Sequence, residues 1–455
     1  MRKFLFLISV VMTLIFVGCQ SRVTQRVKLM TLDPGHFHAA LVQMYMYDQV
    51  SPTVYVYAPE GDDVKMHLEK IELYNTRSER PTAWDEQVYT GDDYLEKMLL
   101  EQKGNVVVLA GNNGKKTGYV KASVDAGINV LSDKPMAIDG SSFKLLEQTL
   151  DDAAAKDVLV YDIMTERSEI NNELQRVLVA MPELFGELEQ GTPEEPAITK
   201  ESVHHFFKYV SGVPLRRPEW YFDVKQQGEG IVDVTTHLVD LVQCTVMPEQ
   251  EIDYKKDIEF TSARRWATKI PRDKYRLVTG KENYAPFLEK DVVNDTLHVY
   301  SNGEMNYRLA GVNCRVSVVW NFMAEIGTEG TGDTHYSVVK GTKANVEIRQ
   351  GAEQGYKPML YVVNKTGDEA AFEQTLNAAL GSIGKQYPNL SLKKVAANEW
   401  QVIIPASITK THEMRFSSVM KVYLGYLAAG EIPAWERSHM KAKYYTTTRA
   451  YELAK

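Results

Sequence analysis

Cysteine is scarce in this sequence. Three cysteines occur among 455 residues, and no two of them form a Cys-x-x-Cys pair. This excludes a disulfide framework. Beyond Cys19 near the N-terminus, Cys244 and Cys314 remain. The sequence leaves open whether their sulfur atoms lie close enough to form a bond.

Clustered positive charge is also absent. The formal net charge is −8, and no basic run is interleaved with aromatic residues. We therefore expect no nucleic-acid partner. Hydrophobic residues make up 44% and charged residues 25%, which is ordinary for a globular protein. The length is enough for two or three domains.

A long hydrophobic run occurs only at the N-terminus. Residues 4–17 are almost entirely apolar and follow two basic residues. The run is too short for a typical spanning helix and is typical of a signal peptide. Phe16-Val17-Gly18-Cys19 resembles a bacterial lipobox, so residues 1–19 are expected to be a lipoprotein signal peptide with a lipid on Cys19. Export without a lipid is the alternative.

The expected lipoprotein has a tether at residues 20–26 that carries no acidic cluster after the cysteine. This favours an anchor on the periplasmic side of the bacterial envelope. Contact with a membrane is then expected only through the lipid.

Strands and helices alternate in the next part of the chain. Apolar or β-branched runs predict strands, and stretches with helical spacing lie between them, which predicts a parallel, doubly wound α/β domain over residues 27–200. The expected strands are 27–32, 53–57, 105–110, 128–131 and 158–161, and the expected helices are 37–48, 63–73, 92–102, 115–126 and 141–155.

After a polar, proline-containing linker candidate at 190–200, the pattern changes. Longer strands predict an α+β domain over residues 201–455 with an open, mainly antiparallel sheet. The expected elements are strands at 204–210, 312–323, 335–340, 343–349, 359–364, 390–396 and 400–404, a hairpin at 297–309 with its tip at 301–304, and helices at 369–383 and 412–429.

The three glycines of a dinucleotide-binding turn are missing after the first strand. The turn reads Asp33-Pro34-Gly35-His36-Phe37-His38, and only Gly35 is glycine. A pyrophosphate normally rests on the helix that opens at this point, so residues 35–38 are candidate cofactor contacts. A structural turn is the alternative. A metal site is not expected, because two histidines are too few ligands.

Other candidate cofactor contacts follow later strands. Glu60 is the nearest acid that could bind the adenosine ribose after the second strand, although Asp62 competes with it. Ala110, Asn112 and Asn113 follow the buried third strand. Small and amide side chains there let a ribose or nicotinamide approach the backbone, and an ordinary loop is the alternative.

The stretch Ser132-Asp133-Lys134-Pro135 is the most informative in the chain. Proline restricts the residue before it, so Lys134 is expected in a stiff, extended connection at the end of a strand. A lysine placed there can meet a substrate hydroxyl or a nicotinamide ring. The alternative is a surface lysine.

A second cluster combines acids with a histidine. Asp233 and His237 are four residues apart, and so are Thr236 and Asp240, which places each pair on one face of an expected helix. An acid one turn from a histidine can orient its ring and raise its basicity. The alternative is a structural hydrogen-bonded pair.

Together these motifs resemble the glucose–fructose oxidoreductase and inositol dehydrogenase family (Gfo/Idh/MocA). Its signature glutamate-lysine-proline is here Asp133-Lys134-Pro135, preceded by Ala126-Gly127. Its tryptophan, glycine cluster and Asp-x-x-x-His are here Trp220, Gly228, Gly230, Asp233 and His237. The family's order, a Rossmann domain and then an open antiparallel sheet, agrees with the pattern above.

The resemblance implies roles for these residues. Lys134 would position the reacting hydroxyl and the nicotinamide, His237 would act as general base, and Asp233 would bind substrate and orient that base. Asp133, Pro135 and Trp220 would line the cofactor site. Lys208, Arg217, Tyr221 and Asp240 are the candidate substrate contacts; for the basic residues among them, solvated surface positions are the alternative.

The resemblance implies an NAD(P)-dependent oxidoreductase, with NAD favoured, that acts on a secondary hydroxyl of a sugar or glycoside. Because free nicotinamide cofactor is scarce outside the cytoplasm, the cofactor is expected to be tightly bound and recycled. The alternatives are a redox-neutral glycosidase with a transient keto intermediate and a non-catalytic sugar-binding lipoprotein. A homo-oligomer through the C-terminal sheet is also expected.

Overall fold

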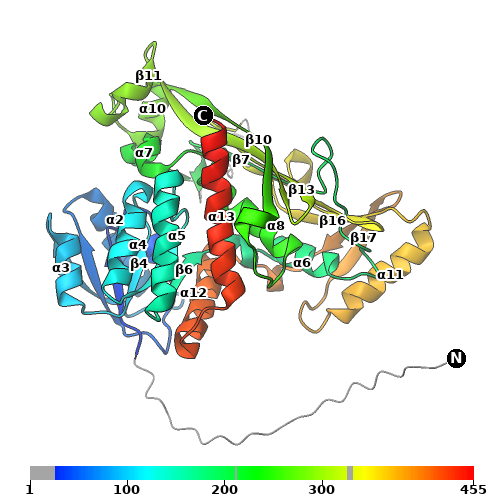
Figure 1. Ribbon diagram of the computed structural model, residues 1–455, viewed down its shortest axis with the longest axis horizontal. Helices are drawn as coiled ribbons and strands as arrows, with labels where there is room; N and C mark the ends of the chain where they lie inside the picture. The colour runs from blue at the N-terminus through cyan, green and yellow to red at the C-terminus, as the bar shows by residue number, and fades with distance from the viewer. Residues whose placement is uncertain (1–25, 211–212, 325–331) are drawn as a thin grey trace, which may run out of the picture.

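The computed structural model describes residues 26–210, 213–324 and 332–455 (Figure 1). The expected signal peptide with Cys19, and the tether up to residue 25, lie outside the described residues. Among the helices of the described residues, none is both long and apolar enough to cross a membrane. Cys244 and Cys314 are both free thiols.

Six parallel strands form the N-terminal sheet, in the order β3-β2-β1-β4-β5-β6. β1 and β4 are completely buried, as their continuous apolar runs predict. The strands are β1 (Leu29–Leu32), β2 (Thr53–Ala58), β3 (Asp85–Thr90), β4 (Val106–Leu109), β5 (Asn129–Asp133) and β6 (Val160–Ile163), with helices α1 (His38–Leu41), α2 (Asp62–Thr76), α3 (Tyr94–Glu101), α4 (Asn113–Asp125) and α5 (Gly140–Ala155) between them. The predicted doubly wound α/β domain is confirmed.

The second sheet has ten strands, of which nine follow the order β10-β12-β13-β7-β14-β15-β16-β18-β17. β7 and β13 pair in parallel, whereas the other pairs are antiparallel, which confirms the predicted open, mainly antiparallel sheet. Its strands are β7 (Ile198–His205), β10 (Ile258–Pro271), β11 (Val292–Val293), β12 (Thr296–Leu309), β13 (Val312–Asn321), β14 (Thr334–Lys340), β15 (Ala344–Gln350), β16 (Met359–Asn364), β17 (Ser391–Ala396) and β18 (Glu399–Ile403). A small separate ribbon pairs β8 (Tyr209–Val210) with β9 (Val213–Pro214).

Helices cover the second sheet and connect it to the first. α6 (Ile170–Val179) contacts β15, α8 (Thr235–Val246) contacts β13, and α13 (Ala434–Leu453) contacts β10. α13 also packs on α5, and α12 (His412–Ala429) packs on β6 and α1, so the C-terminal helices lie between the two sheets (Figure 1). The remaining α-helices are α7 (Val224–Gln227), α9 (Tyr254–Asp257), α10 (Arg272–Thr279) and α11 (Glu369–Ser382).

The expected helix at 37–48 is much shorter than predicted. α1 spans only His38–Leu41. The Trp84 indole donates to the carbonyl of Gln43 at 2.6 Å, and the Arg77 guanidinium donates to the carbonyl of Met44 at 2.5 Å. These carbonyls therefore bond side chains from the segment between α2 and β3 instead of continuing a helix.

The expected hairpin at 297–309 is wrong. β12 is one continuous strand, in which Gly303 pairs with Arg265 of β10 and with Val318 of β13. A side chain at Gly303 would place its Cβ 2.4 Å from the Cβ of Ile231. The Asn-Gly pair thus allows the segment before α8 to approach the sheet, and it forms no turn.

Three of the elements that were not predicted from the sequence are β3, β10 and α13, and one linker was misplaced. β3 is polar, β10 alternates irregularly between exposed and partly buried residues, and α13 buries many threonines and ion-paired side chains. None of the three shows a clear apolar period. Residues 198–200 of the expected linker belong to β7.

Candidate functional site

The candidate site lies where the order of the parallel sheet reverses. β2 and β4 flank β1 on opposite sides, so a crevice opens at the carboxyl ends of β1 and β4, where ligands bind in folds of this type. The predicted residues at this edge are His36 and His38 after β1, Asn112 and Asn113 after β4, and Asp133, Lys134 and Pro135 at the end of β5.

Lys134 forms an ion pair with the second domain. Its Nζ donates to Asp233 Oδ1 at 2.6 Å, and the two side chains are only 11% and 10% exposed. Lys134 extends from the end of β5, and its backbone N–H is held by Asp133 Oδ1 at 3.0 Å. The lysine therefore has a fixed direction and is not a free surface lysine.

The expected hydrogen bond between Asp233 and His237 is not present. α8 begins at Thr235, so Asp233 lies in the turn before the helix and not one helical turn from His237. The Asp233 carboxylate is bonded by Lys134 and by Gln227 Nε2 at 3.0 Å. His237 Nδ1 is buried without a hydrogen-bond partner among the described residues. Asp233 therefore orients Lys134 rather than His237.

His237 is held in its neutral form. Burial and the positive charge of Lys134 lower the pKa of His237 well below 6.5. A neutral imidazole can accept a proton. With a lysine N–H donor fixed nearby, the pair can bind a hydroxyl and remove its proton.

The loop after β1 does not fit a dinucleotide pyrophosphate. The Gly35 N–H donates to Asp33 O at 2.9 Å, the His36 N–H to Ala110 O at 3.1 Å, and the His38 N–H to His36 Nδ1 at 3.4 Å. These are the groups that would otherwise bind phosphate oxygens. The helix that follows has only four residues and so offers a weak dipole.

Acidic side chains surround the same loop. Asp33 accepts from Tyr119 Oη at 2.7 Å and Lys115 Nζ at 3.2 Å. A Cβ added to Gly35 would lie 3.0 Å from Asp63 Oδ2 and 3.4 Å from the Trp220 ring, so these two side chains already fill the space that glycine opens. Trp220 Nε1 donates to Asp63 at 3.2 Å, and burial raises the pKa of Asp63 to about 6.

The two histidines of the loop meet Asp133. His38 Nδ1 lies 2.9 Å and His36 Nδ1 3.8 Å from the same carboxylate oxygen, Asp133 Oδ2. Burial alone would raise the pKa of Asp133, but the charge and hydrogen bond of His38 outweigh it and lower that pKa. Burial and His38 hold the pKa of His36 well below 6.5.

The amides after β4 join the two domains. Asn112 caps α4 by accepting from the backbone N–H of Gly114 at 3.0 Å, and its Nδ2 donates to Gln226 at 2.9 Å. Asn113 Nδ2 donates to Gln227 O at 2.7 Å. These contacts hold α7 against the N-terminal end of α4. Phe37 and Glu60, by contrast, are exposed.

Among the predicted substrate contacts, Lys208 and Arg217 are held by neighbouring side chains, whereas Asp240 belongs to a buried ion-pair network. Lys208 Nζ bonds Asp333 at 2.6 Å, and the Arg217 guanidinium lies 4.5 Å from the centroid of the Tyr221 ring. Asp240 is 1% exposed and bonds Arg167 and Lys443, so its carboxylate faces the protein interior rather than a substrate.

Sequence reasoning missed two groups at the site, the buried Lys116 and the half-buried Gln227. Lys116 donates to Asn113 Oδ1 at 2.5 Å, and burial lowers its pKa to about 8. Gln227 holds Asp233. The spacing of Asn113 and Lys116, one helical turn apart, could have indicated the first contact.

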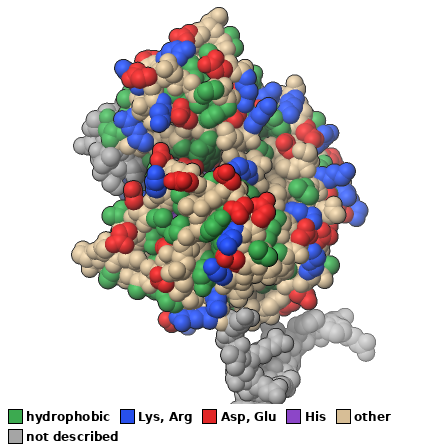
Figure 2. Space-filling model, turned by 90° about the vertical axis from the view of Figure 1, so that its left-hand side faces the viewer, with side chains coloured by type: hydrophobic (Ala, Val, Ile, Leu, Met, Phe, Trp, Pro, Cys, Tyr) green, Lys and Arg blue, Asp and Glu red, His purple; other side chains and the backbone are tan. Residues whose placement is uncertain are grey.

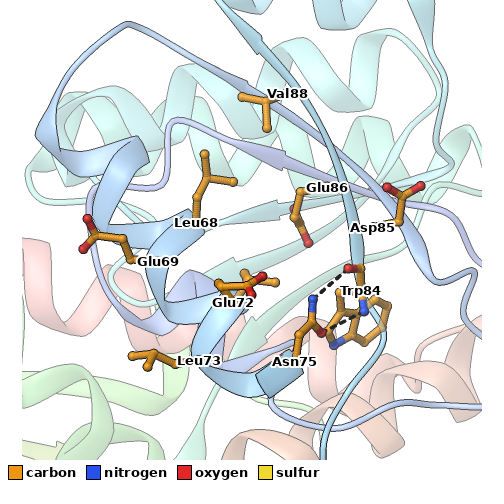
Figure 3. A pocket seen from close by; sticks show the side chains of 10 residues that line it. Leu68, Glu69, Glu72, Leu73, Asn75, Trp84, Asp85, Glu86 and Val88 are labelled. Atoms are coloured by element: carbon orange, nitrogen blue, oxygen red, sulfur yellow. Dashed lines mark hydrogen bonds between the residues drawn. The ribbon is translucent and has the colours of Figure 1, made fainter. Parts of the chain in front are cut away.

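A separate hollow of about 750 Å³ lies between α2 and β3 (Figure 3). Leu68, Ile71 and Trp84 line it with several acids, and Asn75 bonds the backbone of Trp84. None of the predicted site residues lines it. Figure 2 shows the face on the left-hand side of Figure 1, where positive and negative side chains are interspersed.

Known proteins resemble this chain at two levels. Residues 174–455 match the family model described as "Putative oxidoreductase C terminal domain", whereas no curated protein matches. The crystal structure of a putative oxidoreductase from Parabacteroides merdae is 57% identical with a TM-score of 0.91, and the match covers 94% of this chain and 97% of that one.

More distant structures share the fold alone. KijD10, a 3-ketoreductase from Actinomadura kijaniata in complex with TDP-benzene and NADP, is 10% identical with a TM-score of 0.53, covering 93% of this chain and 96% of that one. Biliverdin reductase from Synechocystis, in complex with biliverdin and NADP+, is 9% identical with a TM-score of 0.56, covering 94% and 99%. From the family model and the Parabacteroides merdae structure, the chain belongs to the oxidoreductase family described as "Putative oxidoreductase C terminal domain".

Proposed function

We propose that the protein is an NAD(P)-dependent oxidoreductase of the Gfo/Idh/MocA type that acts on a secondary hydroxyl of a sugar or glycoside. The observation that carries this proposal is the Lys134–Asp233 ion pair of 2.6 Å at the carboxyl edge of the parallel sheet. The charge of Lys134 also helps to lower the pKa of His237 and so keeps that imidazole neutral. The family supports a redox reaction, and the sugar substrate is our proposal.

The three side chains have distinct roles in this proposal. Lys134 donates a hydrogen bond to the substrate oxygen, and Asp233 keeps the ammonium in place. His237 takes the hydroxyl proton, because its imidazole is neutral at pH 7. A bound nicotinamide supplies the hydride acceptor.

The nicotinamide half and the phosphate half of the cofactor site differ in fit. Lys134 offers a cation at the nicotinamide end, where the amides of Asn112 and Asn113 are bonded to Gln226 and Gln227 and so shape the site without contributing free donors. The loop at Gly35 has its N–H groups bonded within the protein, so we assign it no role in holding phosphate. We favour NAD because Glu60 follows β2, where an acid can bind the ribose hydroxyls.

One observation favours a second candidate, a non-catalytic sugar-binding protein. The filled space at Gly35 is what a fold that has given up its dinucleotide would show. Against it stand the buried lysine, acid and neutral histidine, which sugar binding alone does not need.

Extraction of the cofactor separates these candidates. The purified protein is denatured and the supernatant is analysed for nicotinamide dinucleotides by mass spectrometry. Released NAD or NADP supports the oxidoreductase. Absence of cofactor, together with no binding on titration, supports the sugar-binding protein. A protein that contains cofactor is then mixed with glycosides: a keto sugar indicates net oxidation, whereas free sugar indicates a redox-neutral glycosidase.

We also propose a location, a domain division and an assembly for the protein. We place the protein on the periplasmic side of the envelope, anchored through lipidated Cys19. We divide it into domains at residues 27–200 and 201–455, and we propose a homo-oligomer through the second sheet. Labelling with a fatty-acid analogue in wild type and Cys19→Ala tests the anchor.

A further inference from the structure

We propose that His36, His38 and Asp133 bind a single divalent transition-metal ion of the zinc class. This inference is independent of the proposed redox reaction. It follows from the loop after β1, in which the groups expected to bind an anion are used internally and the side chains form a set of cation ligands.

The geometry of the three side chains suits such an ion. One nitrogen of each histidine and one oxygen of Asp133 all lie within 4.8 Å of one another. Asp133 Oδ2 is 2.9 Å from His38 Nδ1 and 3.8 Å from His36 Nδ1. A tetrahedral ion with ligand distances near 2.1 Å separates its ligands by roughly 3.4 Å, so small side-chain rotations suffice.

The ligand types also suit a transition metal. Two imidazoles and one carboxylate form a common set for zinc and for other first-row metals, and they leave at least one position open for water or a substrate oxygen. Calcium and magnesium, which prefer oxygen ligands, fit less well.

Rigid elements hold the three ligands. Asp133 ends β5, and its other oxygen, Oδ1, accepts from the backbone N–H of Lys134 at 3.0 Å. This leaves Oδ2 directed at the histidines. The backbone N–H of His36 is tied to Ala110 O at 3.1 Å, so the loop is fixed to the end of β4. Metal sites depend on such supporting bonds.

The site is enclosed but reachable. The side chain of Asp133 is 7% exposed, that of His38 13% and that of His36 26%. The centroid of the Phe416 ring lies 4.7 Å from that of the His38 ring, and the centroid of the His412 ring lies 5.4 Å from it. An ion can therefore enter past His36, while Phe416 and His412 of α12 cover His38. The hydrogen bond that His36 Nδ1 accepts from the His38 N–H is long, at 3.4 Å, and an ion at this nitrogen would replace it.

The test is metal binding in the absence of sugar and added nicotinamide. Full-length protein is stripped with a chelator and titrated with Co²⁺, whose visible absorption reports low-symmetry coordination by nitrogen and oxygen. Zn²⁺ is then added in competition. We expect one ion per chain, with affinity reduced roughly 100-fold or more in His36→Ala and His38→Ala, because each removes a direct ligand. The control His298→Ala, on β12, keeps wild-type affinity.

His36→Ala is the decisive variant, because His36 is the most exposed ligand and its loss disturbs folding least. Its circular dichroism spectrum and melting temperature are compared with those of wild type. A folded His36→Ala that binds Co²⁺ as tightly as wild type overturns the proposal. So does a wild-type protein without a saturable Co²⁺ spectrum. Neither result bears on the extraction of nicotinamide.

Discussion

Lys134 Nζ lies 2.6 Å from Asp233 Oδ1, and this contact joins the end of a parallel strand in the first domain to the turn before α8 in the second. Both side chains are almost buried, and Gln227 bonds the other carboxylate oxygen at 3.0 Å. The lysine is thus held from one domain while its backbone belongs to the other. The geometry of the candidate site therefore depends on how the two domains pack.

Asp233→Asn should impair turnover more than substrate binding. The amide can still contact Gln227, but it no longer carries the charge that fixes the ammonium of Lys134. We expect kcat to fall roughly 10- to 100-fold with a smaller change in KM, since positioning for proton transfer contributes on that scale. Steady-state kinetics on a glycoside substrate measure it. Lys256→Ala, which removes an exposed charge, serves as the control. An effect confined to KM would contradict this role.

The pH profile should reflect the neutral state of His237. Because burial and the charge of Lys134 lower the pKa of His237, the acidic limb of kcat/KM should lie well below pH 6.5. In Lys134→Ala the positive charge is removed, so the pKa rises and the limb of the residual activity moves to higher pH. Profiles between pH 4 and pH 9 test this. A limb that does not move would exclude His237 as the group titrated.

The buried network around α13 should dominate the stability of the second half of the chain. Lys443 bonds Asp240 at 2.7 Å and Asp162 at 2.8 Å, and Arg167 bonds Asp240 and Glu436. Lys443→Met leaves two acids without this partner, and we expect a loss of about 3–5 kcal/mol in the free energy of unfolding. Lys256→Ala should cost less than about 1 kcal/mol. Denaturant unfolding measures both, and equal losses would contradict the network's importance.

Asp63 should make stability depend on pH. Burial raises its pKa from 3.8 to about 6 in the folded protein. A raised pKa means that the folded state binds the proton more tightly than the unfolded state does. The resulting contribution of Asp63 to the free energy of unfolding is full below pH 4 and is lost as pH rises through about 6. Asp63→Asn removes the effect while its oxygen can still accept from Trp220. The variant should gain on the order of 1 kcal/mol relative to wild type between pH 5 and pH 7.

Thermal unfolding of both proteins across this range checks the effect of Asp63. A constant difference in melting temperature would show that the carboxyl does not titrate there.

Much of the fold could be predicted because apolar periods decide it. The runs at 29–32 and 106–109 fill buried strands, and their order with the helices gives the parallel sheet. Asn302-Gly303 led to the wrong prediction of a hairpin turn. A glycine that is needed for the close approach of Ile231 gives the same sequence signal as a turn. α13 was missed because its buried side chains are largely polar and satisfied by partners from β6 and α8.

The candidate site was predicted in its residues but not in its contacts. Asp133, Lys134, Asp233 and His237 are all near the crevice, yet the partner of Asp233 is Lys134. Where α8 begins decides this, and helix ends are set by packing more than by pattern. The cluster of His36, His38 and Asp133 joins residues about 95 positions apart in sequence, so only the sheet order brings them together.

The most direct test of the central claim is to incubate the protein with glycosides and NAD, and to follow the sugar by mass spectrometry and the nicotinamide by its absorption. We predict a sugar lighter by two hydrogens and one reduced nicotinamide for each oxidised sugar, with both signals reduced roughly 100-fold or more in Lys134→Ala and His237→Ala. Oxidation at wild-type rates in both variants would contradict it.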